Sequence, residues 1–204
     1  MKKIVLKAHR ATFAPLAQSF QALVRSIIFQ QLSGASATAI LNKFVALPSV
    51  KKFPSPHEVL NYSDEQFQTS GVSPQKREYL RDLARRFLDG TIEPKKFRKM
   101  SDTEIIEHLV VVKGVGVWTA HMFLIFHLGR PNVLPVGDLA IRKGFQKVFA
   151  LKGEPSEKKM YALAEPYAGK YSALAKYLWS VMDEQKVIKK KLAKSHRKTT
   201  ITKK

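Results

Sequence analysis

The sequence contains no cysteine among its 204 residues. Disulfide bonds, thiolate zinc sites and iron–sulfur clusters are therefore excluded. Long apolar runs are missing too, since no stretch approaches the roughly 20 uninterrupted apolar residues that a membrane helix needs. The first apolar run, residues 4–6, is too short for the core of a signal peptide. These absences predict an intracellular protein that does not enter a membrane.

Acidic residues are scarce, with 16 Asp and Glu against 36 Lys and Arg, so the formal net charge is +20. We expect the lysine-rich residues 189–204 to be a disordered basic tail, and the rest of the chain is strongly cationic as well. Such a surplus of positive charge serves solubility in some proteins and binding to a membrane surface in others. A protein with so much positive charge most often binds an anionic polymer, and we expect nucleic acid to be the partner here.

Apolar residues recur at helical spacing along the whole chain, and no segment alternates as a strand does. Ser101 and Glu104 have the spacing of a capping box, and Gly90 has the position of a helix end. The first helix is expected to end near residue 28. The other expected helices cover residues 36–47, 56–62, 74–89, 102–111, 117–128, 138–150, 156–164 and 171–188. The sequence therefore predicts an all-α fold of about eight to ten helices.

Helices this short are expected to form two helical subdomains flanking a DNA-binding cleft rather than one core. The terminal subdomain would combine residues 1–33 with residues 134–188. Residues 34–133 would form a helical bundle that carries a hairpin at 109–120.

Two glycines, Gly114 and Gly116, lie between two apolar helical segments. A glycine pair allows a tight turn with positive φ, and it exposes backbone N–H groups beside the start of a helix. That arrangement suits a phosphate, but it is also found at a plain corner between two helices, and the spacing alone favours neither. A dinucleotide fingerprint is disfavoured because the third glycine and a preceding strand are missing.

Four segments, in this order, resemble the helix-hairpin-helix (HhH-GPD) DNA glycosylase superfamily. Residues 23–40, LVRSIIFQQLSGASATAI, are similar to its minor-groove segment, and residues 109–120, LVVVKGVGVWTA, to its helix-hairpin-helix motif. Residues 129–144, GRPNVLPVGDLAIRKG, are similar to its Pro-containing loop and catalytic aspartate. Residues 164–180, AEPYAGKYSALAKYLWS, resemble the last helix of the 3-methyladenine DNA glycosylase II (alkylpurine) branch. The likeness covers about residues 15–185.

This resemblance implies a monofunctional base-excision enzyme that hydrolyses the N-glycosidic bond of 3-methyladenine or 7-methylguanine and leaves an abasic site. Its partner would be double-stranded DNA, from which the alkylated base is flipped. Asp138 would be the catalytic carboxylate, although its position also suits a helix N-cap, and one residue can do both. Trp118 stands where bifunctional relatives carry a lysine, so no lyase activity is expected.

The resemblance also implies which residues bind DNA and the base. DNA contacts are expected at Lys113, Gly114, Val115, Gly116 and Thr119 in the hairpin, and at Gln30, Gln31, Leu32 and Ser33 after the first helix. The base pocket is expected at Trp118, Trp179, Phe29 and Tyr167. No cofactor is required, but the backbone carbonyls of Val110, Val112 and Val115 correspond to a structural Na⁺ or K⁺ site. Lys113 replaces the proline that is common in this hairpin.

Two alternatives stay open at this point. One is a non-catalytic helix-hairpin-helix protein that only binds DNA, and the Pro-containing loop before Asp138 speaks against it. The other is a glycosylase for another lesion, because pocket shape decides the target base. We expect a monomer associated with DNA, in a bacterial nucleoid or a eukaryotic nucleus.

Overall fold

The computed structural model describes residues 18–47 and 52–184, and every regular element within them is a helix. The predicted all-α class is therefore confirmed. The described residues up to Arg130 form one compact unit and those from Pro131 onward form another. Within this described part, no helix is both long and apolar enough to cross a membrane. The expected basic tail, residues 189–204, lies outside the described residues.

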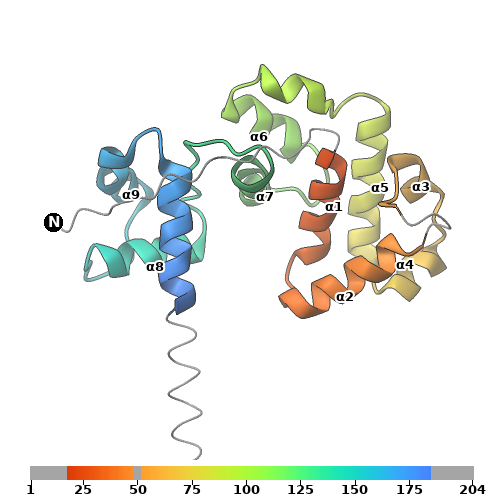
Figure 1. Cartoon of the computed structure of the whole chain (residues 1–204), viewed down its shortest axis with the longest axis horizontal. Helices are drawn as coiled ribbons and strands as arrows, with labels where there is room; N and C mark the ends of the chain where they lie inside the picture. Colours follow the sequence, from red (N-terminus) through yellow and green to blue (C-terminus); the bar gives the residue numbers. More distant parts are fainter. Residues whose placement is uncertain (1–17, 48–51, 185–204) are drawn as a thin grey trace, which may run out of the picture. The chain divides into compact units, whose positions relative to one another are not determined.

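The first unit is built around α1 (Ser19–Phe29), which packs against α5 (Pro74–Leu88) and α2 (Gly34–Val45) (Figure 1). The buried residues of α1 recur every three or four positions, as the periodicity predicts. Our assignment of residues 1–33 to the terminal subdomain was wrong for α1, whose buried stripe faces α5 within the unit that ends at Arg130. The expected second boundary, before residue 134, lies close to the observed one.

The rest of the first unit consists of shorter helices. They are α3 (Pro56–Asn61), α4 (Asp64–Ser70), the 3₁₀-helix η2 (Pro94–Arg98), α6 (Asp102–Val110), α7 (Val117–Met122) and the π-helix η3 (Phe123–His127). The expected helix 117–128 is thus observed, but its second half has π geometry. Neither α4 nor η2 was expected, since each buries too few apolar side chains to show a period.

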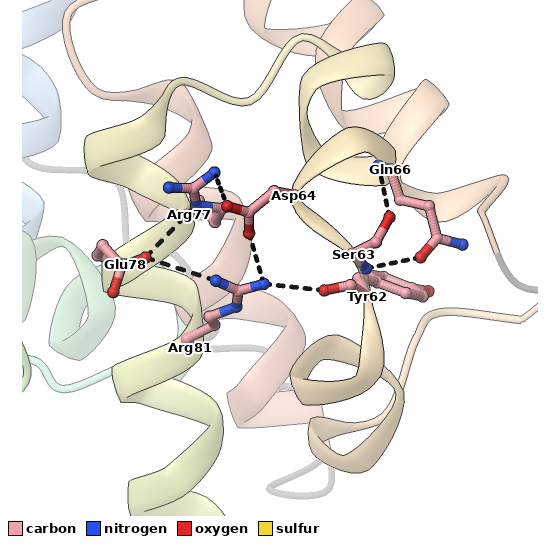
Figure 2. A network of polar contacts seen from close by, with 7 residues as sticks. All are labelled: Tyr62, Ser63, Asp64, Gln66, Arg77, Glu78 and Arg81. Carbon is pink, nitrogen blue, oxygen red and sulfur yellow. Dashed lines mark hydrogen bonds and ion pairs between the residues drawn. The ribbon is translucent and has the colours of Figure 1, made fainter.

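Local polar contacts fix several of these helix ends. The predicted capping box at Ser101 is confirmed: its Oγ accepts a hydrogen bond from the backbone N–H of Glu104, whose carboxylate accepts one from the N–H of Ser101. Figure 2 shows a second set, in which Arg77 and Arg81 of α5 both pair with Asp64 at the start of α4. Such an exposed cluster mainly fixes the register of two helices and stabilises them little.

The second unit contains α8 (Leu139–Val148), α9 (Glu157–Ala164), the 3₁₀-helix η4 (Glu165–Tyr167) and a helix through residues 171–184. Its core is made by Ile141, Phe145, Met160, Leu174 and Leu178, among others. A Cβ at Gly144 would lie 3.0 Å from the Cβ of Leu178, so this glycine lets α8 approach the last helix closely.

Candidate functional site

The glycine turn between α6 and α7 forms the helix-hairpin-helix that the sequence predicts. Gly114 has a φ of +78°, and the ring of Tyr79 occupies the space where a Cβ would stand. Gly116 has an ordinary extended conformation and is the N-cap residue of α7. Only Gly114 therefore needs the left-handed conformation, while Gly116 leaves open space in front of the N-terminus of α7.

A buried carboxylate on α5 holds this turn in place. Oδ2 of Asp82 accepts a 2.9 Å hydrogen bond from the backbone N–H of Lys113 and lies 3.0 Å from Nε of Arg86. Burial raises the pKa of Asp82, but the N–H of Lys113 and the Arg86 guanidinium outweigh it, so the pKa lies below its usual range. Asp82 was missed at the sequence level, although a carboxylate between the buried residues Leu80 and Leu83 is itself a signal.

The segment after α1 is fixed by hydrogen bonds to other elements. Nζ of Lys76 donates to the carbonyl oxygens of Ile28 at 2.7 Å and of Gln30 at 2.8 Å. The side-chain amide of Gln30 in turn donates to the carbonyl oxygen of Gly114 at 2.8 Å. Gln31 then adopts a left-handed conformation, with a φ of +55°. The end of α1 and the hairpin are therefore one connected structure.

The four residues expected to touch DNA after α1 differ in their surroundings. Gln30 is partly buried at the hairpin, whereas Gln31 and Leu32 are exposed. Ser33 is the N-cap of α2, where its Oγ accepts a 3.2 Å hydrogen bond from the N–H of Ser36. The exposed pair Gln31 and Leu32 thus forms the tip of this turn.

A cavity of about 710 Å³ lies between α1, the hairpin and the α7–η3 segment. Of the residues expected at the site, it is lined by Phe29, Gln30, Gln31, Gly114, Trp118 and Thr119. Trp118 and Phe126 on its wall are 49% and 57% exposed, which is unusual for aromatic side chains of this size. The structure therefore brings Phe29 and Trp118 together at a cavity with several aromatic side chains on its wall.

Two polar groups complete this cavity. The guanidinium of Arg25 lies 4.3 Å from the centre of the Phe29 ring, in cation–π geometry. His127 is buried, with Nε2 3.0 Å from Oγ of Ser19 and its ring 4.7 Å from that of Phe123. Burial lowers the pKa of His127 below its ordinary value, so this ring is neutral at pH 7.

Asp138 belongs to the second unit, at the end of the Pro-containing loop. Its backbone N–H donates to the carbonyl of Pro135 at 2.9 Å, which forms the turn before α8. Oδ1 of Asp138 accepts the N–H of Ile141 at 2.9 Å, which confirms the expected N-cap, and also Nε1–H of Trp179 at 3.2 Å. Two donors from different helices therefore orient a half-buried carboxylate.

The other two residues expected in the base pocket, Trp179 and Tyr167, also belong to the second unit. Both pack partly buried against its core, and neither lines the cavity beside Phe29 and Trp118. Trp179 is placed at the carboxylate of Asp138 instead. Their contact with a base stays a prediction.

The proposed cation site consists only of backbone oxygens. Val110 is the last residue of α6, where helix carbonyls lack an intrahelical partner, and the carbonyl of Val112 accepts the N–H of Val115 at 3.0 Å. In the part of the chain that the structure describes, no three His, Asp or Glu side chains gather as a metal site would require. Any ion at the hairpin would thus be held by carbonyls.

Comparison with known proteins places these features in one family. Residues 24–168 match the model of the HhH-GPD superfamily of base excision DNA repair proteins. The DNA-3-methyladenine glycosylase 1 of Schizosaccharomyces pombe is 36% identical over 165 residues, covering 79% of this chain and 72% of that protein.

Two solved structures share the fold along most of the chain. The 3-methyladenine DNA glycosylase of Schizosaccharomyces pombe in complex with abasic DNA has a TM-score of 0.71 and 33% identity, over 84% of each chain. A DNA-3-methyladenine glycosidase from Bacillus halodurans has a TM-score of 0.74 and 33% identity, over 84% of this chain and 78% of that one.

Proposed function

The chain belongs to the HhH-GPD superfamily of base excision DNA repair proteins, and we propose that it is a monofunctional glycosylase of the 3-methyladenine branch. It binds DNA and acts on alkylated bases. Its proposed substrates are 3-methyladenine and 7-methylguanine in duplex DNA, and its proposed product is an abasic site. The observation that carries it is the carboxylate of Asp138, oriented by two N–H donors directly after the Pro-containing loop.

The reaction breaks the bond between C1′ of the deoxyribose and the base nitrogen, and the electron pair leaves with the base. A purine alkylated at N3 or N7 is already cationic, so it departs as a neutral base without being protonated. Positive charge then develops on the sugar, where the carboxylate of Asp138 stabilises it. A water molecule bonds to C1′ and gives up its proton, for which Asp138 is the proposed acceptor.

We propose that the flipped base binds in the cavity of the first unit. Phe29 and Trp118 offer ring faces for stacking, and a cationic alkylpurine gains cation–π energy from them. Gln31 is the better candidate for the residue that fills the gap left by the flipped base, because Gln30 is already bonded to Gly114. Trp118 carries no amine that could attack C1′, which supports simple hydrolysis without strand cleavage.

We propose that the hairpin binds the DNA backbone. Amides at the start of α7 and the cationic Lys113 suit a phosphate. A Na⁺ or K⁺ on the carbonyls of Val110, Val112 and Val115 would neutralise further phosphate charge, and bond cleavage itself needs no cofactor. We propose that the protein acts as a monomer.

The test is release of free base from duplexes that contain 3-methyladenine or 7-methylguanine, with wild type and Asp138→Asn compared at saturating enzyme. We expect release by wild type, loss in the variant, and equal affinity of both for an abasic duplex. The DNA strand should stay intact until alkali is added, and borohydride should trap no protein–DNA adduct. If both proteins bind DNA and neither releases a base from these or other lesions, the chain is a binding module and the proposal is wrong.

A further inference from the structure

We propose that Lys76, Tyr79 and Asp82 form a positioning row on α5 that holds the wedge turn (residues 30–33) and the hairpin in one fixed register. This inference rests on the proposed function, because it concerns how the turn and the hairpin meet the same DNA. None of the three residues needs to touch DNA for this role. The row acts through the backbone atoms that it holds.

Lys76 holds the wedge turn. Its Nζ donates to the carbonyls of Ile28 and Gln30 at 2.7 and 2.8 Å, and these are among the last carbonyls of α1, which have no intrahelical partner. A cation at a helix C-terminus is also favoured by the helix dipole. The side chain is partly buried, and burial lowers its pKa. The left-handed Gln31 follows directly, so Lys76 fixes the chain where its direction changes.

Tyr79 and Asp82 hold the hairpin. The ring of Tyr79 lies against the Cα of Gly114, and Asp82 accepts the N–H of Lys113 at 2.9 Å. Residues three apart on an α-helix lie on neighbouring turns of nearly the same face. Because an α-helix has about 3.6 residues per turn, the row 76, 79 and 82 winds about 120° around α5, and it reaches first the wedge turn and then the hairpin.

Gln30 closes the connection. Its backbone carbonyl is held by Lys76, and its side-chain amide donates to the carbonyl of Gly114 at 2.8 Å. Wedge turn, hairpin and α5 are thus joined in a closed ring of contacts that involves no exposed tip residue. A protein that inserts a wedge beside a gripped phosphate needs such a ring, since a misplacement of about 1 Å can cost roughly a hundredfold in rate.

The experiment compares Lys76→Met with Arg77→Met in the full chain. Both variants remove one cation from neighbouring positions of α5, but Arg77 pairs with Asp64 at 2.7 Å and takes no part in the row (Figure 2). The readouts are the single-turnover rate of 7-methylguanine release, the fluorescence of a 2-aminopurine beside the lesion as a measure of flipping, and the affinity for an abasic duplex.

We expect Lys76→Met to lower the release rate and the flipping signal by about tenfold or more, while Arg77→Met stays within about threefold of wild type. Lys76→Arg, which keeps donors at this position, should restore most of the rate. Abasic-duplex affinity should fall equally in the two Met variants, since each loses one charge. Equal effects of both variants on rate and flipping would overturn the proposal.

A second pair keeps the test decisive if Lys76→Met does not fold. Asp82→Asn keeps the shape of the side chain and weakens its bond to Lys113, and Glu78→Gln is the exposed control on the same helix. Asp82→Asn should slow flipping and Glu78→Gln should not, and equal rates would again contradict the row. Absence of base release by wild type refutes the proposed glycosylase instead, and the flipping signal still reports on the row.

Discussion

Trp179 and Ile141 donate to the same oxygen of Asp138, Oδ1, from two different helices at 3.2 and 2.9 Å. One donor is the backbone at the start of α8 and the other is an indole of the last helix. The carboxylate is therefore oriented by the secondary structure and by the packing of the second unit together. Capping and the proposed catalytic role are separable at this residue, because they depend on different properties of the side chain.

Replacing Asp138 with Asn should abolish catalysis and preserve the fold. Asn caps a helix about as well as Asp, so the free energy of unfolding should change little, while base release should fall by at least about a hundredfold. Asp138→Ala should lose the same activity and, in addition, about 1 kcal/mol of stability. Urea unfolding and single-turnover base release measure the two effects. Near-normal release by Asp138→Asn would exclude the carboxylate as the catalytic group.

Trp179→Phe should slow the reaction without removing the packing of the side chain. A hydrogen bond to a charged acceptor contributes about 1.5 kcal/mol, so we expect a rate about tenfold lower with KM nearly unchanged. The melting temperature should drop only slightly, because Phe fills most of the space. A change confined to KM would argue that Trp179 contacts the substrate and does not position Asp138.

The features that could be predicted from the sequence are those specified by neighbouring residues. The Ser101 capping box and the N-cap at Asp138 each depend on residues three apart, and both are observed. The membership of α1 was mispredicted because a periodic stripe shows that a face is buried but not which helix buries it. The contacts of Lys76 and Asp82 join distant segments: the apolar neighbours of Asp82 indicate that it is buried, but no local pattern indicates which partner either residue has.

Backbone conformation is likewise predictable where the residue type decides it, and not where contacts between distant segments decide it. A positive φ at Gly114 is expected because glycine adopts it readily, whereas the positive φ of Gln31 follows from the contacts on either side of the turn. The cavity itself needs α1, the hairpin and η3 in place at once. The four base-pocket residues could be proposed from a family resemblance, but the structure was needed to show that Phe29 and Trp118 belong to one unit and that Trp179 and Tyr167 belong to the other.

Gly114→Ala and Gly116→Ala should have opposite consequences. The added methyl at Gly114 meets the Tyr79 ring and a left-handed backbone, so we expect a loss of about 1–3 kcal/mol of stability. At Gly116 the new Cβ meets nothing within 4 Å, so stability should hold while the methyl obstructs a phosphate. Thermal unfolding measures the loss of stability, and binding to an abasic duplex measures the loss of DNA affinity. A Gly114→Ala variant with the stability and the DNA affinity of wild type would contradict the tight packing at Tyr79.

Trp118→Ala should reduce excision of 7-methylguanine much more than Trp118→Phe. The side chain is half exposed, so its loss changes folding little, whereas losing the ring face removes about 0.5–2 kcal/mol of cation–π energy, or roughly 2- to 30-fold in kcat/KM. Affinity for an abasic duplex, which holds no base, should stay the same. An equal loss of affinity for the abasic duplex would place Trp118 on the DNA backbone instead of the base.

The protein should lose stability as the pH falls below about 6.5. Burial lowers the pKa of His127 and of His121, in the latter case against the opposing charge of Asp102. The unfolded chain therefore binds these protons first, so the stability present above about pH 6.5 is lost below it. The carboxyl groups with lowered pKa, such as Glu58, act only below about pH 4.5 and do not overlap this window.

Urea unfolding at a series of pH values measures this loss. His127→Gln should flatten the plot of unfolding free energy against pH below about pH 6.5, even where it lowers stability at pH 7.5. If the free energy of unfolding of His127→Gln depends on pH as strongly as that of wild type, the buried imidazole beside Ser19 is not the cause of the loss of stability in acid.

The π-helix η3 gives this protein a way to change its binding cavity by chain length. The hydrogen bonds of a π-helix join residues five apart, one more than in an α-helix, and π-helical turns recur at functional sites. Three cavity residues, Phe123, Phe126 and His127, lie on η3. Deleting a single residue there would convert the segment to α-helix and rotate these side chains relative to the wall formed by α1. We therefore expect a one-residue insertion or deletion in η3 to reshape this wall of the cavity in a way that substitution alone does not.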